Sequence, residues 1–217
     1  MNKVGVEMNK PVLVIEDLTV SFDGFKAVSD LNFYLDKNEV HVVIGPNGAG
    51  KTTVLDLICG KTKATSGTIK FNDIELTKLK EFDIVRKGVG RKFQNPNIYE
   101  NLSVYDNLEM SFPRGRNVFG ALFFRRTKDV DERIREVAGK IFLTDLLDTS
   151  AGLLSHGQKQ WLEIGMLLMQ DPELLMLDEP VAGMSVSERE QTAQLLREIS
   201  KGRSVLVLSL IHISEPT

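Results

Sequence analysis

The stretch GPNGAGKTT at residues 45–53 decides the fold of this chain. It follows the apolar run VHVVI and opens the stretch KTTVLDLICG, so it lies between an expected strand and an expected helix. In that context it matches G-x-x-x-x-G-K-S/T, a loop that binds phosphate through backbone N–H groups and the helix N-terminus. A glycine-rich turn with a chance lysine is the alternative, and the ordered strand, loop and helix argue against it.

This loop predicts a nucleotide and Mg²⁺ as ligands. Lys51 is expected to reach the β- and γ-phosphates, and Thr52 is expected to place its hydroxyl on Mg²⁺. Thr53 is expected to bond a further phosphate oxygen. The predicted nucleotide-binding residues of the loop are Gly45, Pro46, Asn47, Gly48, Ala49, Gly50, Lys51, Thr52 and Thr53.

A pair of acidic residues follows a second apolar run, LLMLDEP at residues 174–180. Ligands of parallel α/β sheets bind at the carboxyl ends of the strands, where this pair is expected to lie. Asp178 is predicted to hold Mg²⁺, and Glu179 is predicted to polarise the attacking water as a general base. A merely solvated Asp-Glu pair is the alternative, which the phosphate loop in the same chain makes less favourable.

Bulk properties describe an ordinary globular protein. The chain has 217 residues, of which 42% are hydrophobic and 26% charged, which suits one large domain or two small ones. The net charge of −3 argues neither for nor against a nucleic-acid partner. Cys59 is the single cysteine, so an internal disulfide is excluded. No apolar run reaches the roughly 18 residues of a membrane span, and the first residues lack a signal-peptide pattern, with Met8 as an alternative start.

Strand and helix patterns change along the chain. Strands are predicted over 12–22, 27–35, 40–45 and 66–72, and helical signals without a convincing strand dominate from about 103 to 170. The α/β pattern then returns, with a buried strand at 204–208. Ser185 and Glu188 have the spacing of a capping box at the start of a helix. The sequence therefore predicts an α/β core that a helical segment interrupts.

The stretch LSHGQ, which begins at Leu154, resembles the LSGGQ signature of the ABC-type ATPases. It precedes LLMLDEP by 20 residues, and the whole chain is similar to that family in motif order and spacing. The resemblance implies an α/β fold, a P-loop NTPase core of ABC type with an antiparallel β subdomain and an inserted helical subdomain. The expected organisation is a tail over 1–10, an ATPase domain over 11–208 with the helical insertion at about 95–170, and a tail over 209–217.

The resemblance also implies roles for residues outside the phosphate loop. Phe22 is expected to stack on the adenine of ATP, and Gln94 to sense Mg²⁺ and the attacking water. Ser155, with Gly157 and Gln158, is expected to cap the γ-phosphate of ATP held by another subunit. The purely structural alternatives are a core position for Phe22, a surface position for Gln94 and a helix N-cap for Ser155.

His156 stands where the family usually has glycine. The backbone N–H is kept with any residue, so the change is tolerable, and no second ligand at useful spacing favours a metal site. Trp161 follows on the same helix and is expected in the core. Residues 180–184 match the family's D-loop, which contacts the partner subunit.

Some stretches narrow the resemblance to one group of importers. Residues 89–111 and 154–184 resemble ATPase subunits of importers for branched-chain amino acids and for urea or short amides, and LSHGQKQWLEIGMLLMQ is most similar to the urea type. The expected function is an ATPase that powers import of urea or short amides. A branched-chain amino acid importer and a non-transport ABC ATPase are the alternatives. A GTPase is excluded, because no N-K-x-D motif follows the phosphate loop.

The same resemblance implies partners and a location. The expected partners are an identical or paralogous ATPase subunit, two membrane-spanning permease subunits and, indirectly, a periplasmic or extracellular binding protein, without nucleic acid. Residues 95–129 are expected to dock the permease, and packing of that segment on its own subdomain is the alternative. The expected location is peripheral, on the cytoplasmic face of the membrane.

The C-terminal residues depart from the family pattern. A switch histidine normally follows the last core strand, where this chain has Ser209 and Leu210. His212 comes two residues late, about 6–7 Å along an extended strand, and is not given that role. The segment LSLIHISEPT resembles a translated sequencing adapter, so residues from about 209 are expected to be non-native and the chain as it stands to be impaired in hydrolysis.

Overall fold

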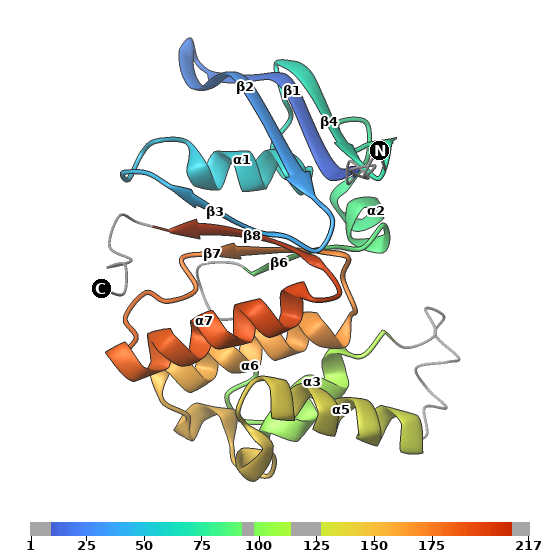
Figure 1. The fold of residues 1–217 in the computed structure, drawn as a ribbon, viewed down its shortest axis with the longest axis vertical. Coiled ribbons are helices and arrows are strands. Elements are labelled where there is room, and N and C mark those ends of the chain that lie inside the picture. Colours follow the sequence, from blue (N-terminus) through green and yellow to red (C-terminus); the bar gives the residue numbers. More distant parts are fainter. Residues whose placement is uncertain (1–9, 93–97, 114–126, 210–217) are drawn as a thin grey trace, which may run out of the picture.

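The computed structural model describes residues 10–92, 98–113 and 127–209. These residues form two four-stranded sheets, one antiparallel with strand order β2-β1-β4-β5 and one parallel with strand order β3-β8-β7-β6. Figure 1 shows the antiparallel sheet and α1 on one side of the parallel sheet and helices α6 and α7 on the other. The predicted fold class is confirmed, including the antiparallel part.

The antiparallel sheet opens with a long hairpin that the sequence patterns predicted as two strands. Asp23 (φ 47°) and Gly24 (φ 88°) form its two-residue turn, and both have the positive φ that such tight turns demand. Asp-Gly is among the residue pairs that adopt this turn most readily. The strands are β1 (Pro11–Phe22), β2 (Phe25–Asp36), β4 (Ser66–Phe71) and β5 (Ile74–Glu75).

The parallel sheet carries the predicted apolar runs. Every residue of β7 and β8 is buried, as expected of strands that helices or a second sheet cover on both faces. Strand β3 lies at one edge of this sheet, and Ser209 at the end of β8 pairs with Ile44 at the end of β3. The strands are β3 (Val40–Ile44), β6 (Val89–Lys92), β7 (Leu174–Asp178) and β8 (Ser204–Ser209).

Helices occupy the middle of the chain, as predicted. Between residues 103 and 170, the only β structure among the described residues is one isolated bridge between Ser103 and Ser150. Within this predicted helical stretch, residues 114–126 lie outside the described residues. The helices are α1 (Lys51–Ile58), α2 (Glu81–Arg86), α3 (Val104–Ser111), α5 (Lys128–Lys140), α6 (His156–Met169) and α7 (Val186–Ser200), with 3₁₀ turns at Thr144–Leu146 and Ala151–Leu153.

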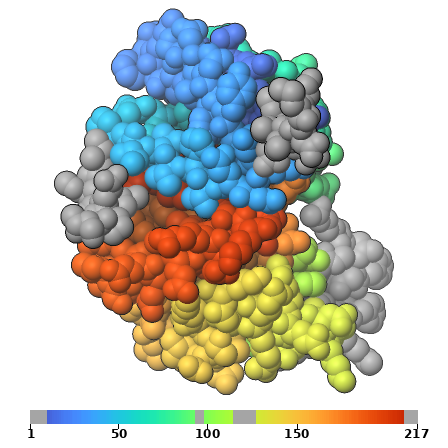
Figure 2. Space-filling model, viewed as in Figure 1, coloured from blue at the N-terminus to red at the C-terminus, as the bar shows by residue number. Residues whose placement is uncertain are grey.

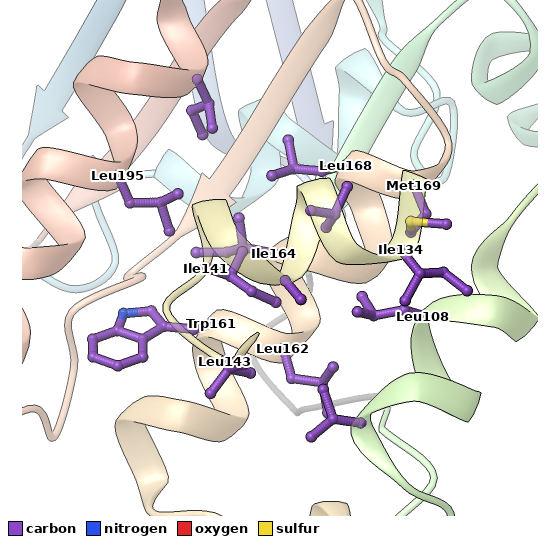
Figure 3. Packing of buried hydrophobic residues seen from close by; sticks show 14 of the residues in the cluster. Leu108, Ile134, Ile141, Leu143, Trp161, Leu162, Ile164, Leu168, Met169 and Leu195 are labelled. Atoms are coloured by element: carbon purple, nitrogen blue, oxygen red, sulfur yellow. The ribbon is translucent and has the colours of Figure 1, made fainter. Parts of the chain in front are cut away.

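Two hydrophobic clusters cover the two faces of the parallel sheet. In β7, Leu174 and Met176 belong to the cluster with α1 and the antiparallel sheet, whereas Leu175 and Leu177 belong to the cluster with the helices. This division follows from the alternation of side chains along a strand. Figure 3 shows the helical cluster, in which side chains from α3, α5, α6 and α7 meet. In Figure 2, the N-terminal part of the chain (blue and cyan) and the helical segment (yellow) lie on either side of the C-terminal part (orange to red).

Candidate active site

The phosphate loop connects the end of β3 to the start of α1. Gly48 (φ 80°) and Gly50 (φ 82°) both have left-handed backbone conformations, which glycine adopts without steric cost. A Cβ on Gly50 would lie 2.5 Å from the carbonyl oxygen of Ala27 in β2, so this glycine also permits a close backbone approach. The predicted strand, loop and helix are therefore present. The left-handed conformations of Gly48 and Gly50 explain why these two loop positions are glycine.

Lys51 folds back onto the loop. Its Nζ donates hydrogen bonds to the carbonyl oxygens of Gly45 (2.5 Å) and Pro46 (2.8 Å). The first turn of α1 contains no acidic residue, so no carboxylate of the helix itself offsets the positive end of its dipole. The loop thus presents an ammonium and a helix N-terminus together, which is an arrangement that binds anions.

Thr52 and Asp178 join the phosphate loop to the end of β7. Thr52 Oγ1 donates a hydrogen bond to Asp178 Oδ2 at 3.1 Å across 126 residues of sequence. The Asp178 side chain is buried at the carboxyl end of its strand. Hydroxyl and carboxylate oxygens are the ligand type that Mg²⁺ accepts, so this pair fits the predicted Mg²⁺ site. The structure therefore brings together two residues that the sequence only suggested to be neighbours.

Glu179 has a strained backbone conformation that the sequence did not indicate. Its φ is 49°, in the left-handed region that non-glycine residues seldom occupy, and its N–H donates to the carbonyl oxygen of Leu208 at 2.9 Å. Such outliers cost about 1–3 kcal/mol each and persist where the surrounding structure fixes them, often at functional sites. The side chain is half-buried beside Asp178, which suits the predicted polarising role.

The signature residues form the N-terminus of α6. Ser155 is the N-cap: its Oγ accepts a hydrogen bond from the Gln158 N–H (3.2 Å), and Gln158 Oε1 accepts from the Ser155 N–H (2.9 Å). The reading of Ser155 as a helix cap is confirmed, and this role is compatible with a ligand role. Its hydroxyl also donates to Glu188 Oε1 at 3.2 Å.

Glu188 packs against the signature from α7. A Cβ on Gly157 would lie 2.3 Å from Glu188 Oε1, so only glycine permits this approach. Hydrogen bonds from the backbone and then the hydroxyl of Ser185 hold the pKa of the Glu188 carboxyl below its usual value. The predicted capping box of Ser185 and Glu188 is confirmed, but no sequence pattern indicated that Glu188 also touches Ser155.

His156 connects the signature to residues 180–184. Its Nε2 lies 3.1 Å from the carbonyl oxygen of Ala182 and 3.1 Å from Gln160 Nε2, and its ring packs beside Gly183. In the part of the chain that the structure describes, no group of three potential ligands could hold a metal ion. The Trp161 side chain is buried, as expected.

Phe22 lies at the tip of the first hairpin. Its side chain is 47% exposed, which argues against the core alternative, and Phe25 directly opposite is 70% exposed. Exposed aromatic rings suit stacking on a base, and no sequence motif pointed to Phe25. Gln94 and His212 lie outside the described residues; β6 ends at Lys92, shortly before Gln94.

The fold and this site define a P-loop nucleotide-binding protein, and comparison with known proteins gives the family. The family model for the ABC transporter matches residues 28–182. The chain is 35% identical over 212 residues to the high-affinity branched-chain amino acid transport ATP-binding protein BraF of Pseudomonas aeruginosa, covering 94% of this chain and 83% of that protein. It is 33% identical to the corresponding protein LivG of Escherichia coli, with the same coverage.

Solved structures agree with this similarity. The ADP conformation of an ATP-binding cassette of an ABC transporter superposes with a TM-score of 0.80 at 28% identity, covering 93% of this chain and 82% of that chain. A nucleotide-free cassette gives a TM-score of 0.79 at 28% identity, covering 92% and 81%. This chain belongs to the ABC transporter family, as an ATP-binding subunit that hydrolyses ATP in support of transport. Within the described ranges, no helix is long and apolar enough to cross a membrane.

Proposed function

We propose that this chain powers an importer of the branched-chain amino acid group. The observation that carries its ATPase role is the 3.1 Å contact between Thr52 and Asp178, which joins the phosphate loop to the end of β7. The relatives at 33–35% identity, named as branched-chain amino acid transport ATP-binding proteins, support the substrate class. The transported molecule itself does not touch an ATPase subunit, so the substrate rests on this similarity.

ATP binds at the phosphate loop in this proposal. The Lys51 ammonium leaves the carbonyl oxygens of Gly45 and Pro46 and contacts the β- and γ-phosphates. Thr52 and Asp178 would hold Mg²⁺, which when bound neutralises charge on the phosphate oxygens. The exposed ring of Phe22 stacks on adenine.

Hydrolysis needs a correctly placed water and a stabilised γ-phosphate. Glu179 would polarise the attacking water, and Gln94 would sense Mg²⁺ and that water. Removal of a general base typically lowers the rate about 10²–10⁴-fold.

The site is completed by a second ATPase subunit. Ser155, Gly157 and Gln158 cap the γ-phosphate of ATP bound to that subunit, and residues 180–184 contact it. The partner is a paralogous or identical chain, and the pair lies on the cytoplasmic face of the membrane beneath two permease subunits that a binding protein supplies. Phosphoryl transfer depends mainly on positioning and charge stabilisation, so closure of two half-sites over ATP supplies what one chain lacks.

Urea or short amides are the second candidate substrate class. The stretch LSHGQKQWLEIGMLLMQ at residues 154–170, which resembles the urea-type subunits, favours them. Both candidates share the ATPase chemistry and differ only in the permease and binding protein that the subunit serves.

Reconstitution of the complete transporter in proteoliposomes tests the proposal. Uptake of labelled leucine and labelled urea would be measured with ATP inside, and Glu179→Gln would serve as the matched control. We expect ATP-dependent leucine uptake that the control abolishes. Urea uptake without leucine uptake would favour the second candidate. Co-purification with nucleic acid and no permease would contradict both and favour a non-transport ABC ATPase.

A further inference from the structure

Strand β6 carries two consecutive basic residues whose side chains are both buried, Arg91 and Lys92. Successive side chains of a strand point to opposite faces of the sheet. Arg91 therefore faces the side of α1, and Lys92 faces the side of α6. Charged residues are seldom fully buried unless they are paired, so each requires an explanation.

Each side chain forms an ion pair with a different helix. Arg91 Nη1 donates to Asp56 Oδ1 of α1 at 2.5 Å. Lys92 Nζ lies 3.0 Å from Glu163 Oε2 of α6, and these two side chains are only 1% and 5% exposed. Helix α1 begins at Lys51 of the phosphate loop, and α6 begins beside the signature serine. The strand thus connects the helix that begins at this chain's phosphate loop to the helix whose N-terminus is proposed to complete the ATP site of the second subunit.

A buried ion pair is weak evidence for stability, because two apolar side chains of similar volume often stabilise a fold equally well. Glu163 lies between Leu162 and Ile164, which both pack in the helical core that Figure 3 shows. An apolar contact at this position would tolerate sliding of α6 along the sheet. An ion pair in a low-dielectric interior penalises such sliding, because separation exposes each charge to an apolar environment.

We propose that Lys92 and Glu163 are positioning residues that fix the direction of α6 relative to the phosphate-loop helix. Through Arg91 and Asp56 on the other face, the pair transmits nucleotide binding at α1 to the signature end of α6. The proposal rests on the proposed ATP site. In it, the ion pair affects the rate of ATP hydrolysis and not the affinity of the site for ATP.

The chain contains its own reporter for α6. Trp161 is the single tryptophan and lies two residues before Glu163 on the same helix. It is buried, its Nε1 donates to Thr192 Oγ1 of α7 at 2.9 Å, and its ring forms a T-shaped contact with the ring of Phe142. Its fluorescence therefore depends on how α6 packs against its neighbours.

The test compares three variants with the unaltered chain. Lys92→Met/Glu163→Leu replaces the pair by apolar side chains and is expected to fold. Lys92→Glu/Glu163→Lys reverses the charges. Glu100→Gln is the matched control, because it removes an exposed ion pair to Lys159, also on α6. For each protein, MgATP affinity and the Trp161 emission change at saturating MgATP would be measured on the purified chain. The kcat and KM for ATP would be measured on the chain assembled with its partner subunits.

We expect the apolar variant to bind MgATP within about twofold of the unaltered chain, to lose the emission change and to lose about tenfold in kcat. The charge-reversed variant regains both, and Glu100→Gln resembles the unaltered chain. The proposal would be overturned if the apolar variant kept the full emission change and kcat, or if the charge-reversed variant regained neither. It would also be overturned if the unaltered chain bound MgATP without an emission change. Failure of the unaltered chain to bind MgATP would instead overturn the ATP site on which the proposal rests.

Discussion

Substitution of Gly50 by alanine tests how the phosphate loop is built. The new Cβ would lie 2.5 Å from the Ala27 carbonyl oxygen and 3.3 Å from Val28 Cγ2, and the first of these atoms belongs to the backbone of β2. A backbone atom cannot rotate away as a side chain can, so β2 or α1 must shift. Gly48 is a matched control: its φ of 80° is close to the 82° of Gly50, and no atom lies within 4 Å of its Cβ position.

The two costs follow from these contacts. A left-handed conformation costs an L-residue about 1–2 kcal/mol, and this applies to both positions. Overpacking adds about 1–3 kcal/mol, and this applies only at Gly50. Gly48→Ala is therefore expected to lower the free energy of unfolding by about 1–2 kcal/mol and Gly50→Ala by about 2–5 kcal/mol.

Urea unfolding at 25 °C measures both costs, with Trp161 emission and circular dichroism as independent probes. Gly50→Ala should also weaken ATP binding more than Gly48→Ala, because the shift moves the N-terminus of α1. Equal unfolding free energies for the two variants, within about 0.5 kcal/mol, would refute the reasoning, because the backbone contact would then have relaxed without cost.

Three further expectations concern the packing, ionisation and capping of buried or helix-terminal groups. Gly165→Ala places a Cβ 2.5 Å from Ile141 Cδ1 and should destabilise the fold by about 1–2 kcal/mol. The cost should be smaller in an Ile141→Val background, which lacks that Cδ1 atom. If urea unfolding showed that the costs of the two substitutions simply add, the contact would not be the cause. Burial raises the pKa of the Cys59 thiol to about 11 from 9.0, so stability should fall as pH rises from 9 to 11, because the unfolded thiol ionises first; a flat pH profile would contradict the shift. Ser155→Ala removes the N-cap of α6 and should cost about 1 kcal/mol, whereas Ser155→Thr, which keeps a cap and the hydroxyl that donates to Glu188, should cost less in the same assay.

Local patterns predicted much of the fold and site. The apolar runs at 40–44, 174–177 and 204–208 lie in parallel strands, and the glycines of the phosphate loop stand between a strand and a helix. These features depend on neighbouring residues, so periodicity and motif spacing reveal them.

The features that the sequence did not reveal depend on residues distant in the chain. Adjacent basic residues such as Arg91 and Lys92 are typical of a surface, and only the packing of α1 and α6 on β6 buries them. The strained φ of Glu179 occurs directly after β7, where the Glu179 N–H bonds to Leu208 of β8. The contact of Glu188 with the signature requires α7 to pack beside α6. Neither spacing nor composition contains that information.

Phosphate release from MgATP by the assembled transporter and by its Glu179→Gln variant, with ATP binding measured in parallel, tests the central claim most directly. We expect both proteins to bind ATP with similar affinity and the substitution to lower the rate of release about 10²–10⁴-fold. Equal rates of release, or an unaltered chain that binds no ATP, would contradict the account.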